Sequence, residues 1–254
     1  MIVVFGALKI ELDNIIRKTN VLYTMKKDGV RIQRGNLNGK DIIIVITGMG
    51  RENAIKATRL VLKMISQSGT SNRILITGFC GAADPGLMIG DLVVYREIMD
   101  LGSIKDYLAG TGQESFNRYT ITGFGPSKYM DGFRTVVCGC VEEAVTDPKI
   151  KEKIYKNFST DVMDMESYWI AGELLTGGFS IKDICCIRAV SDNAKDYLPI
   201  YFASKSKSKM ILYFTRSVFL SIFSRKELRA NINALRNIKN AKKQIDIRLL
   251  KNIS

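Results

Sequence analysis

Apolar residues in the first 195 positions form short continuous runs that alternate with segments of helical spacing. Continuous apolar runs predict strands buried on both faces, and apolar residues three or four apart predict helices that pack on a sheet. This alternation indicates an α/β protein. The predicted strands are 1–7, 30–34, 41–47, 73–77, 92–96, 134–140, a short one from 161, and 184–190.

Helical patterns fill most of the intervals between these strands. The predicted helices are 8–18, 52–66, 148–157, 167–175 and a long one at 201–223. The segment Asn36-Leu37-Asn38-Gly39 between two strands indicates a hairpin turn. Residues 97–132 are polar and Gly-rich without a clear period, so we expect irregular structure there, in one interpretation a lid.

The C-terminal residues 224–254 differ from the rest of the chain in pattern and in charge. Residues 1–200 carry 25 Lys and Arg against 23 Asp and Glu, whereas residues 201–254 carry 13 against 2. Apolar residues at helical spacing indicate an amphipathic helix with a basic face. They are Leu228, Ile232, Leu235, Ile238, Ala241, Ile245 and Leu249. We therefore predict a domain at 1–223 and a helical tail at 224–254.

The function of this tail has two interpretations. Its basic face fits an anionic membrane surface, and its apolar stripe equally fits packing on its own domain or on a partner subunit. Binding to nucleic acid is not expected, because aromatic stacking residues are missing from 225–254.

Composition narrows the available chemistry. The chain has no histidine and five cysteines without a Cys-x-x-Cys pair, which argues against a structural zinc site, a Ser-His-Asp triad and a Cys-His pair. We expect no metal, and we expect carboxylates to perform the catalysis. The start of the chain lacks a cleavable signal pattern, and 210–223 is shorter than the roughly 20 apolar residues of a membrane span. A cytoplasmic protein is expected.

Three acidic residues lie where predicted strands end. Glu11 follows the first strand, Glu166 stands where a short strand turns into a helix, and Asp192 ends the last strand. Ligands in α/β proteins bind at such strand ends. Each residue also has a structural explanation, because Asp and Glu are favoured at helix starts and Asp in turns.

Six segments, in order, resemble the nucleoside phosphorylase and nucleosidase superfamily, and most closely its methylthioadenosine/S-adenosylhomocysteine nucleosidases. The segments are Val4-Phe5-Gly6-Ala7-Leu8-Lys9-Ile10-Glu11, Thr47-Gly48-Met49-Gly50-Arg51-Glu52-Asn53-Ala54, Ile76-Thr77-Gly78-Phe79-Cys80-Gly81-Ala82, Ile89-Gly90-Asp91-Leu92-Val93-Val94, Val162-Met163-Asp164-Met165-Glu166-Ser167 and Ile187-Arg188-Ala189-Val190-Ser191-Asp192. The resemblance implies a three-layer αβα sandwich around a central mixed, twisted sheet, to which the tail adds a C-terminal helix.

The resemblance also implies roles for particular residues. Asp192 would protonate the departing purine, and Glu11 would activate the attacking water. Glu166 would hold the ribose hydroxyls, with Met165 against the sugar. Further substrate contacts would come from Met49, Gly78, Phe79, Gly81 and Ser191. The segment 139–144 lacks the aromatic residue that stacks on the base in these nucleosidases.

The reaction implied is hydrolysis of the N-glycosidic bond of a 5′-substituted adenosine, without a cofactor, in a homodimer or larger homo-oligomer. Phosphorolysis is the alternative, with Arg51 as a candidate ligand of inorganic phosphate. The Asp-Met-Glu-Ser stretch and the basic tail also resemble phosphorylases that act on adenosylhopane, an adenosyl lipid. A further alternative is a nucleoside-binding module without turnover.

Overall fold

The computed structural model describes residues 1–65, 72–104, 106, 117–121, 132–197, 233 and 236–245. The strands are β1 (Ile2–Gly6), β2 (Asn20–Lys27), β3 (Val30–Leu37), β4 (Lys40–Ile46), β5 (Arg73–Ala82), β6 (Leu92–Gly102), β7 (Arg118–Thr120), β8 (Arg134–Val141), β9 (Val162–Asp164) and β10 (Ile184–Asp192). The helices are α1 (Lys9–Lys18), α2 (Arg51–Ile65), α4 (Pro148–Phe158), α5 (Ser167–Thr176) and the 3-10 turn η1 (Ile181–Asp183). Residues 236–245 are also helical.

The strands form one mixed sheet in the order β10-β6-β8-β9-β5-β1-β4-β3-β2, with β7 on β6. β1 lies parallel to both β4 and β5, and β5 is parallel to β10. β10 also pairs with β6, which pairs with β8, and β9 joins β8 back to β5. These five strands therefore form a closed ring at one end of the sheet.

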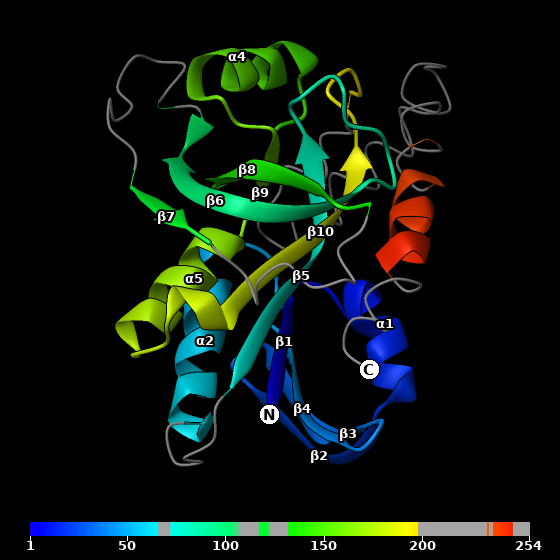
Figure 1. Ribbon diagram of the computed structural model, residues 1–254, viewed down its shortest axis with the longest axis vertical. Coiled ribbons are helices and arrows are strands. Elements are labelled where there is room, and N and C mark those ends of the chain that lie inside the picture. Colours follow the sequence, from blue (N-terminus) through cyan, green and yellow to red (C-terminus); the bar gives the residue numbers. More distant parts are fainter. Residues whose placement is uncertain are drawn as a thin grey trace.

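Helices cover both faces of the sheet (Figure 1). On one face α2 and α5 pack against alternate strand residues such as Val3 and Phe5. On the other face α1 packs against the intervening residues such as Val4. This alternation follows from the two-residue period of a strand. The predicted α/β fold with a central mixed sheet is confirmed.

The turn between β3 and β4 shows why the local sequence folds as it does. Asn38 and Gly39 both have positive φ, 51° and 83°. Asn and Gly are the residues that adopt this conformation readily, as a tight hairpin requires. The Gly39 N–H also donates to Asn36 Oδ1 at 2.8 Å. The predicted hairpin is confirmed.

The structure corrects three expectations about element boundaries. β5 continues to Ala82, although the predicted strand ended at Thr77, before the glycine-rich segment. β6 continues to Gly102 and pairs with β7, so residues 97–102 and 118–120, expected to be irregular, are strands. The pattern missed β2 because its residues are mostly exposed and carry little apolar alternation. In each case pairing with neighbouring strands overrides a weak local signal.

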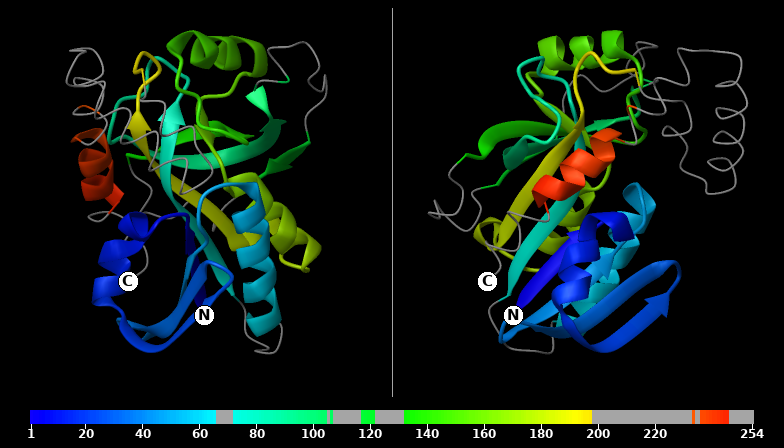
Figure 2. Two further views of the ribbon diagram at one scale, coloured as in Figure 1. Left: turned by 180° about the vertical axis from the view of Figure 1, so that it is seen from behind. Right: turned by 90° about the vertical axis from the view of Figure 1, so that its right-hand side faces the viewer.

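Helix 236–245 packs on the same side of the sheet as α1 (Figure 2). Ala241 and Ile245 are buried in the cluster that contains Leu12 and Ile15 of α1. In this part of the tail the apolar stripe therefore faces the chain's own domain. The predicted helix at 201–223 and residues 224–232, 234–235 and 246–254 lie outside the described residues.

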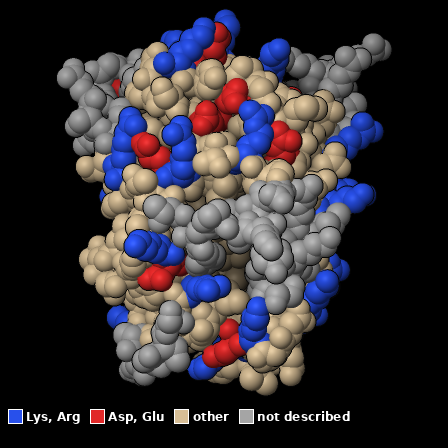
Figure 3. Space-filling view, viewed as in Figure 1, with Lys and Arg blue, Asp and Glu red and all other residues tan. Residues whose placement is uncertain are grey.

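Charged residues of both signs are interspersed on the face shown in Figure 3. Among the described residues, the helices are all too short or too polar to cross a membrane.

Candidate functional site

A pocket of about 330 Å³ lies where β1, β5, β9 and β10 end. Because β1, β5 and β10 run parallel, their carboxyl ends meet at one edge of the sheet. The described lining residues come from these strand ends, from the start of α1, from the turn between β4 and α2, from the end of β8 and the segment after it, and from helix 236–245. They are Ala7, Leu8, Ile10, Glu11, Met49, Phe79, Cys80, Gly81, Val141, Ala144, Val145, Met163, Asp164, Met165, Glu166, Ser191, Asp192 and Ile238.

Glu11 is buried in the first turn of α1, and both of its carboxylate oxygens accept hydrogen bonds. Leu8 N–H donates to Oε2 at 2.7 Å, and Phe79 N–H donates to Oε1 at 3.0 Å. Burial raises the pKa of Glu11, while Arg188 and these backbone donors oppose the rise. A carboxylate with a raised pKa is a better base near neutral pH.

Glu166 is held by a backbone donor from a distant part of the chain. Gly50 N–H donates to Glu166 Oε1 at 2.9 Å, across 116 residues of sequence. Burial raises the pKa of Glu166 to about 7, although Arg188 lowers it. The glycine turn 48–50 therefore positions a carboxylate in the pocket.

Arg188 is fully buried on β10 and connects the acidic residues. Its Nη2 lies 3.2 Å from Asp164 Oδ2 and 3.8 Å from Glu166 Oε2, and it donates to Ser167 Oγ at 2.9 Å. Its Nη1 donates to the Phe79 carbonyl at 3.2 Å. A buried cation is retained at low cost only where it is paired in this way.

Asp164 shapes the corner between β9 and α5. Its Oδ1 accepts from the N–H groups of Glu166 and Ser167, at 3.3 and 3.2 Å. Its Oδ2 accepts from the Ser167 hydroxyl and from the Tyr95 hydroxyl. With these four donors and Arg188, Asp164 is saturated, which fits a structural role beneath Glu166.

Asp192 lies at the other end of the pocket, at the end of β10. Its Oδ1 accepts from Ser191 Oγ at 2.9 Å, and its Oδ2 contacts Lys151 Nζ at 2.5 Å. Burial raises the pKa of Asp192 in spite of the opposing effect of Lys151. A buried acid with a raised pKa is suited to proton donation near neutral pH.

Two glycines on β5 make room for these groups. A Cβ on Gly78 would lie 2.5 Å from Glu11 Oε1 and 2.7 Å from Arg188 Nη1. A Cβ on Gly81 would lie 2.9 Å from Asp192 Oδ2. Gly78 and Arg188 also face each other in the β5–β10 register. The absence of a side chain at Gly78 and at Gly81 therefore lets the charged side chains approach the backbone of β5.

The structure brings most of the predicted site residues together. Those lining the pocket are Glu11, Met49, Phe79, Gly81, Met165, Glu166, Ser191 and Asp192. Gly78 lies behind the lining, against Glu11 and Arg188. Arg51 is not part of the lining: its Nη1 is 3.5 Å from Glu142 Oε1, and its guanidinium stacks 4.2 Å from the Trp169 ring.

Ile238 brings the tail into the site. Its side chain lines the pocket from helix 236–245. The same helix is held by the buried Ala241 and Ile245. Asn237 Nδ2 also donates to Asp196 Oδ2 at 3.4 Å, in the segment that follows Asp192. Among the described residues, the tail therefore contributes Ile238 to the lining of the pocket.

Two charged residues of the site were missed in the sequence. Arg188 has a detectable signal, because a cation inside a fully apolar strand must find a buried partner. Lys151 has a weaker one: it lies three residues before the buried Ile154, on the inner side of a helix that reads as charged and exposed. Nothing in the sequence indicates that its partner is Asp192.

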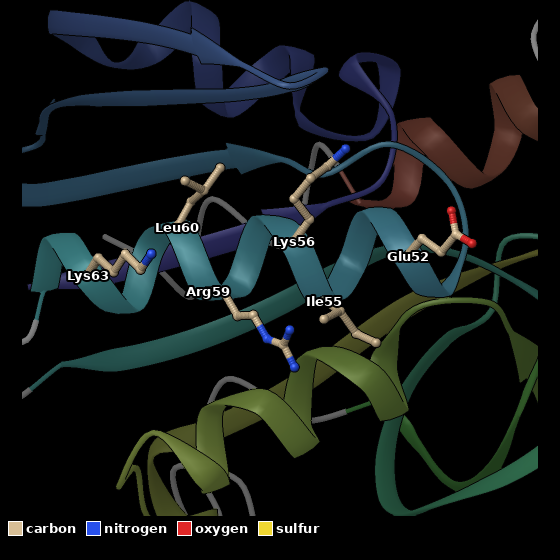
Figure 4. A pocket seen from close by; sticks show the side chains of 6 residues that line it. All are labelled: Glu52, Ile55, Lys56, Arg59, Leu60 and Lys63. Atoms are coloured by element: carbon tan, nitrogen blue, oxygen red, sulfur yellow. The ribbon is translucent and has the colours of Figure 1, made fainter.

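A second hollow, of about 410 Å³, lies on the outer side of α2 and contains none of the predicted residues. Figure 4 shows its six lining side chains along a single helix. Arg59 there pairs with Glu173 at 2.7 Å. A surface built by one helix lacks the converging polar groups of a ligand site, so the pocket at the strand ends is the candidate site.

Comparisons with known proteins agree with this fold. The sequence profile of the phosphorylase superfamily matches residues 1–211. The 5′-methylthioadenosine/S-adenosylhomocysteine nucleosidase of Shewanella loihica is 24% identical over 217 residues, which cover 79% of this chain and 90% of the relative. The corresponding nucleosidase of Shewanella sp. W3-18-1 is 26% identical over 218 residues, covering 79% and 89%.

Solved structures show the same fold. The 5′-methylthioadenosine/S-adenosylhomocysteine nucleosidase from Neisseria meningitidis, in complex with methylthio-immucillin-A, superposes with a TM-score of 0.69 at 18% identity, covering 99% of this chain and 97% of that one. The futalosine hydrolase of Helicobacter pylori superposes with a TM-score of 0.64 at 17% identity, covering 98% and 96%. The resemblance found in the sequence is confirmed, and the chain belongs to the phosphorylase superfamily.

Proposed function

We propose that the protein hydrolyses the N-glycosidic bond of a purine nucleoside, of the 5′-substituted adenosine type, and releases the free base. The observation that carries this proposal is the position of Glu11, Glu166 and Asp192, three buried carboxyl groups around one pocket. The relatives named above are nucleosidases and a futalosine hydrolase, which supports the same reaction class.

The charges of the site match the charges that the reaction develops. Cleavage of an N-glycosidic bond leaves positive charge on the ribose and negative charge on the base. Asp192, whose pKa burial raises, donates a proton to the base. Glu166 accepts hydrogen bonds from the ribose hydroxyls, and Glu11 removes a proton from the attacking water. An acid on one side and carboxylates on the other is also the arrangement of glycoside hydrolases.

Water is favoured over phosphate as the nucleophile. Arg51, the candidate phosphate ligand, points to Glu142 and Trp169 and does not line the pocket. Arg188, the cation nearest to Glu11 and Glu166, is already occupied by carboxylates. A phosphate dianion there would be repelled by whatever negative charge Glu11 and Glu166 carry, whereas a neutral water would not.

The substrate class rests on the relatives and on the pocket wall. The relatives act on methylthioadenosine, S-adenosylhomocysteine and futalosine by their names. Phe79 is the one aromatic side chain among the described lining residues, and most of the others are aliphatic. Such a wall fits a flat base and an apolar 5′ substituent, which includes the adenosyl lipid named above.

Release of free base from a panel of nucleosides tests the proposal. The panel contains adenosine, inosine, methylthioadenosine, S-adenosylhomocysteine and a futalosine-like nucleoside, each with and without inorganic phosphate. We expect base and free sugar without phosphate. Activity only with phosphate would establish phosphorolysis, and binding without turnover of any member would establish a binding module.

For residues 224–254 we propose a tail that docks on the domain 1–223 and completes the pocket. The buried Ala241 and Ile245 support this, while Lys239 and Lys243 are exposed and leave contact with an anionic membrane as a prediction. Co-sedimentation with anionic vesicles compares the intact chain with one that ends at Phe223; equal binding excludes the membrane role. A homodimer or larger oligomer also stays a prediction, which sedimentation velocity checks.

A further inference from the structure

Lys151 is a lysine on α4 whose side chain is 0% exposed. Its Nζ lies 2.5 Å from Asp192 Oδ2, 3.0 Å from the Asn193 carbonyl and 3.4 Å from the Asp196 carbonyl. A lysine ammonium has three N–H donors, and a neutral amine has two. The three acceptors therefore match the ammonium form, and the cation is buried directly behind the acid of the site.

This contact distinguishes the two oxygens of Asp192. Oδ2 accepts a hydrogen bond from Lys151, so a proton on Oδ2 would point toward a hydrogen of the ammonium group and be repelled by it. The acidic proton therefore belongs on Oδ1, beside the Ser191 hydroxyl, which lines the pocket. Ser191 Oγ also reaches the Cys80 carbonyl at 3.1 Å. The hydroxyl can donate to Cys80 while Oδ1 is protonated, and to Oδ1 once it is not.

We propose that Lys151 is a positioning residue for Asp192: it holds Oδ2, keeps the transferable proton on Oδ1, and stabilises the carboxylate left when that proton moves to the substrate. This inference rests on the proposed function.

The step consumes one water. The C1′–N9 bond of the nucleoside breaks and its electron pair goes to the base, while the Oδ1 proton of Asp192 moves to a base nitrogen. The water oxygen forms a bond to C1′ and the water gives a proton to Glu11. Asp192 becomes a carboxylate, and Lys151 takes no part in the proton transfer. The ion pair between Lys151 and Asp192 is thus strongest after the proton has left Asp192. Lys151 therefore stabilises the transition state more than the bound substrate, which lowers the barrier.

Several other groups face Asp192 and act on its titration. Asp196 follows β10, and its charge favours the protonated acid, whereas the Ser191 hydroxyl favours the carboxylate. Cys80 on β5 is buried nearby and neutral, because burial raises its thiol pKa. Glu11 and Glu166 line the same pocket. Lys151 is the cation in direct contact with Asp192 among the described residues.

The main experiment compares the pH profiles of kcat and kcat/KM for wild type, Lys151→Met and Lys151→Gln. Loss of the cation should lower kcat by about 10- to 100-fold, less than the ~10²- to 10⁴-fold contribution of an acid itself, with KM almost unchanged. The alkaline limb of kcat/KM should move to higher pH, because the Asp192 carboxylate loses its partner. Lys153→Met, on the exposed side of the same helix, is the matched control.

A second comparison shows whether Lys151 acts through Asp192. In an Asp192→Asn background, Lys151→Met should cause no further loss of kcat, because the carboxylate that it serves is gone. The same loss in both backgrounds would overturn the proposal. Lys151→Gln, which keeps a donor to Oδ2, serves in both comparisons if Lys151→Met does not fold.

A readout without turnover separates this inference from the proposed function. The Asp192 carboxyl can be titrated by ¹³C NMR, with its signal assigned from Asp192→Asn. We expect Lys151→Gln to raise its midpoint pH, and an unchanged midpoint would overturn the role of Lys151. A wild type that releases no base from any nucleoside, but shows this shift, would contradict only the proposed function.

Discussion

Arg188 Nη2 lies 3.2 Å from Asp164 Oδ2, and both side chains are only 1% exposed. The same guanidinium neutralises part of the charge of Glu166 and Glu11. The carboxyl groups of Asp164, Glu166 and Glu11 can therefore be buried close together because the Arg188 guanidinium lies between them. This relationship makes Arg188 the residue on which the stability of the site depends.

Replacing Arg188 by Met should lower the free energy of unfolding by about 3–5 kcal/mol, because it leaves buried carboxylates without their partner. Urea unfolding at neutral pH measures this. Arg34→Met breaks the exposed 2.8 Å pair with Asp41 and should cost about 1 kcal/mol or less. Equal losses in the two variants would contradict the role assigned to Arg188.

Asp192→Asn should lower turnover by about two to four orders of magnitude, the usual contribution of a general acid, while the fold is preserved. Asparagine has nearly the same shape but carries no acidic proton. Steady-state kinetics and circular dichroism measure the two effects. Asp28→Asn, at an exposed hairpin turn, is the control and should keep full activity. A fully active Asp192→Asn variant would contradict the assignment of Asp192 as the general acid.

The unligated protein should lose stability between pH 4.5 and about 7 through Glu166. Its pKa is about 7 when folded and 4.5 as the ordinary value, so the folded state keeps a proton that the unfolded chain has released. The stabilisation is complete below pH 4.5 and is lost as the pH rises through 7. It amounts to about 3 kcal/mol across that window.

Urea unfolding at several pH values, for wild type and Glu166→Gln, isolates this contribution. The Gln variant should lose less stability across the window than wild type does. Glu152→Gln is the control: Lys156 lowers the pKa of Glu152, so that residue titrates below the window. Parallel curves for wild type and Glu166→Gln would show that the Glu166 pKa is not raised.

Ile238→Trp should weaken nucleoside binding by at least about tenfold, or ~1.4 kcal/mol, because the larger side chain enters the pocket from the tail. Calorimetry with a nucleoside that binds the wild type measures the Kd. Lys239→Trp places the same side chain at the next, exposed position and should leave binding unchanged. Unaltered binding by both variants would show that the tail leaves the pocket in solution.

Gly78→Ala should reduce both stability and activity, because its Cβ would collide with Glu11 and Arg188. Crowding of this kind typically costs about 1–3 kcal/mol. Gly29→Ala provides a matched comparison: Gly29 also has a positive φ, but no atom lies within 4 Å of the added Cβ. A Gly78→Ala variant that loses no more stability than Gly29→Ala would contradict the close approach.

The sequence predicted the order of most strands and helices because buried strands and amphipathic helices leave strong periodic signals. It did not predict β2, whose exposed edge position requires no apolar pattern. It also ended β5 at Thr77, because the glycines that admit Glu11, Arg188 and Asp192 have the composition of a loop. The glycines that the site requires therefore hide the apolar strand pattern in this part of the sequence.

The candidate site was predictable to the extent that the ends of parallel strands lie at the same edge of the sheet. Glu11 lies just beyond β1 and Asp192 ends β10, and both strands run parallel to β5, so these two residues reach one edge of the sheet. Glu166 follows β9, which runs antiparallel to β5, so strand direction alone did not place it there. Contacts that join segments far apart were not predictable: Gly50 to Glu166, Lys151 to Asp192, and Ile238 over the pocket. These depend on packing, which residue spacing alone does not encode.

The pocket wall at Ile238 has a consequence for biosynthesis. Ala7 comes directly after β1, the first strand, whereas Ile238 comes after β10, the last described strand. A nascent chain can therefore form the sheet before it can enclose a nucleoside. Ligand affinity should develop only once the tail has left the ribosome, so the nucleoside cannot guide the early steps of folding.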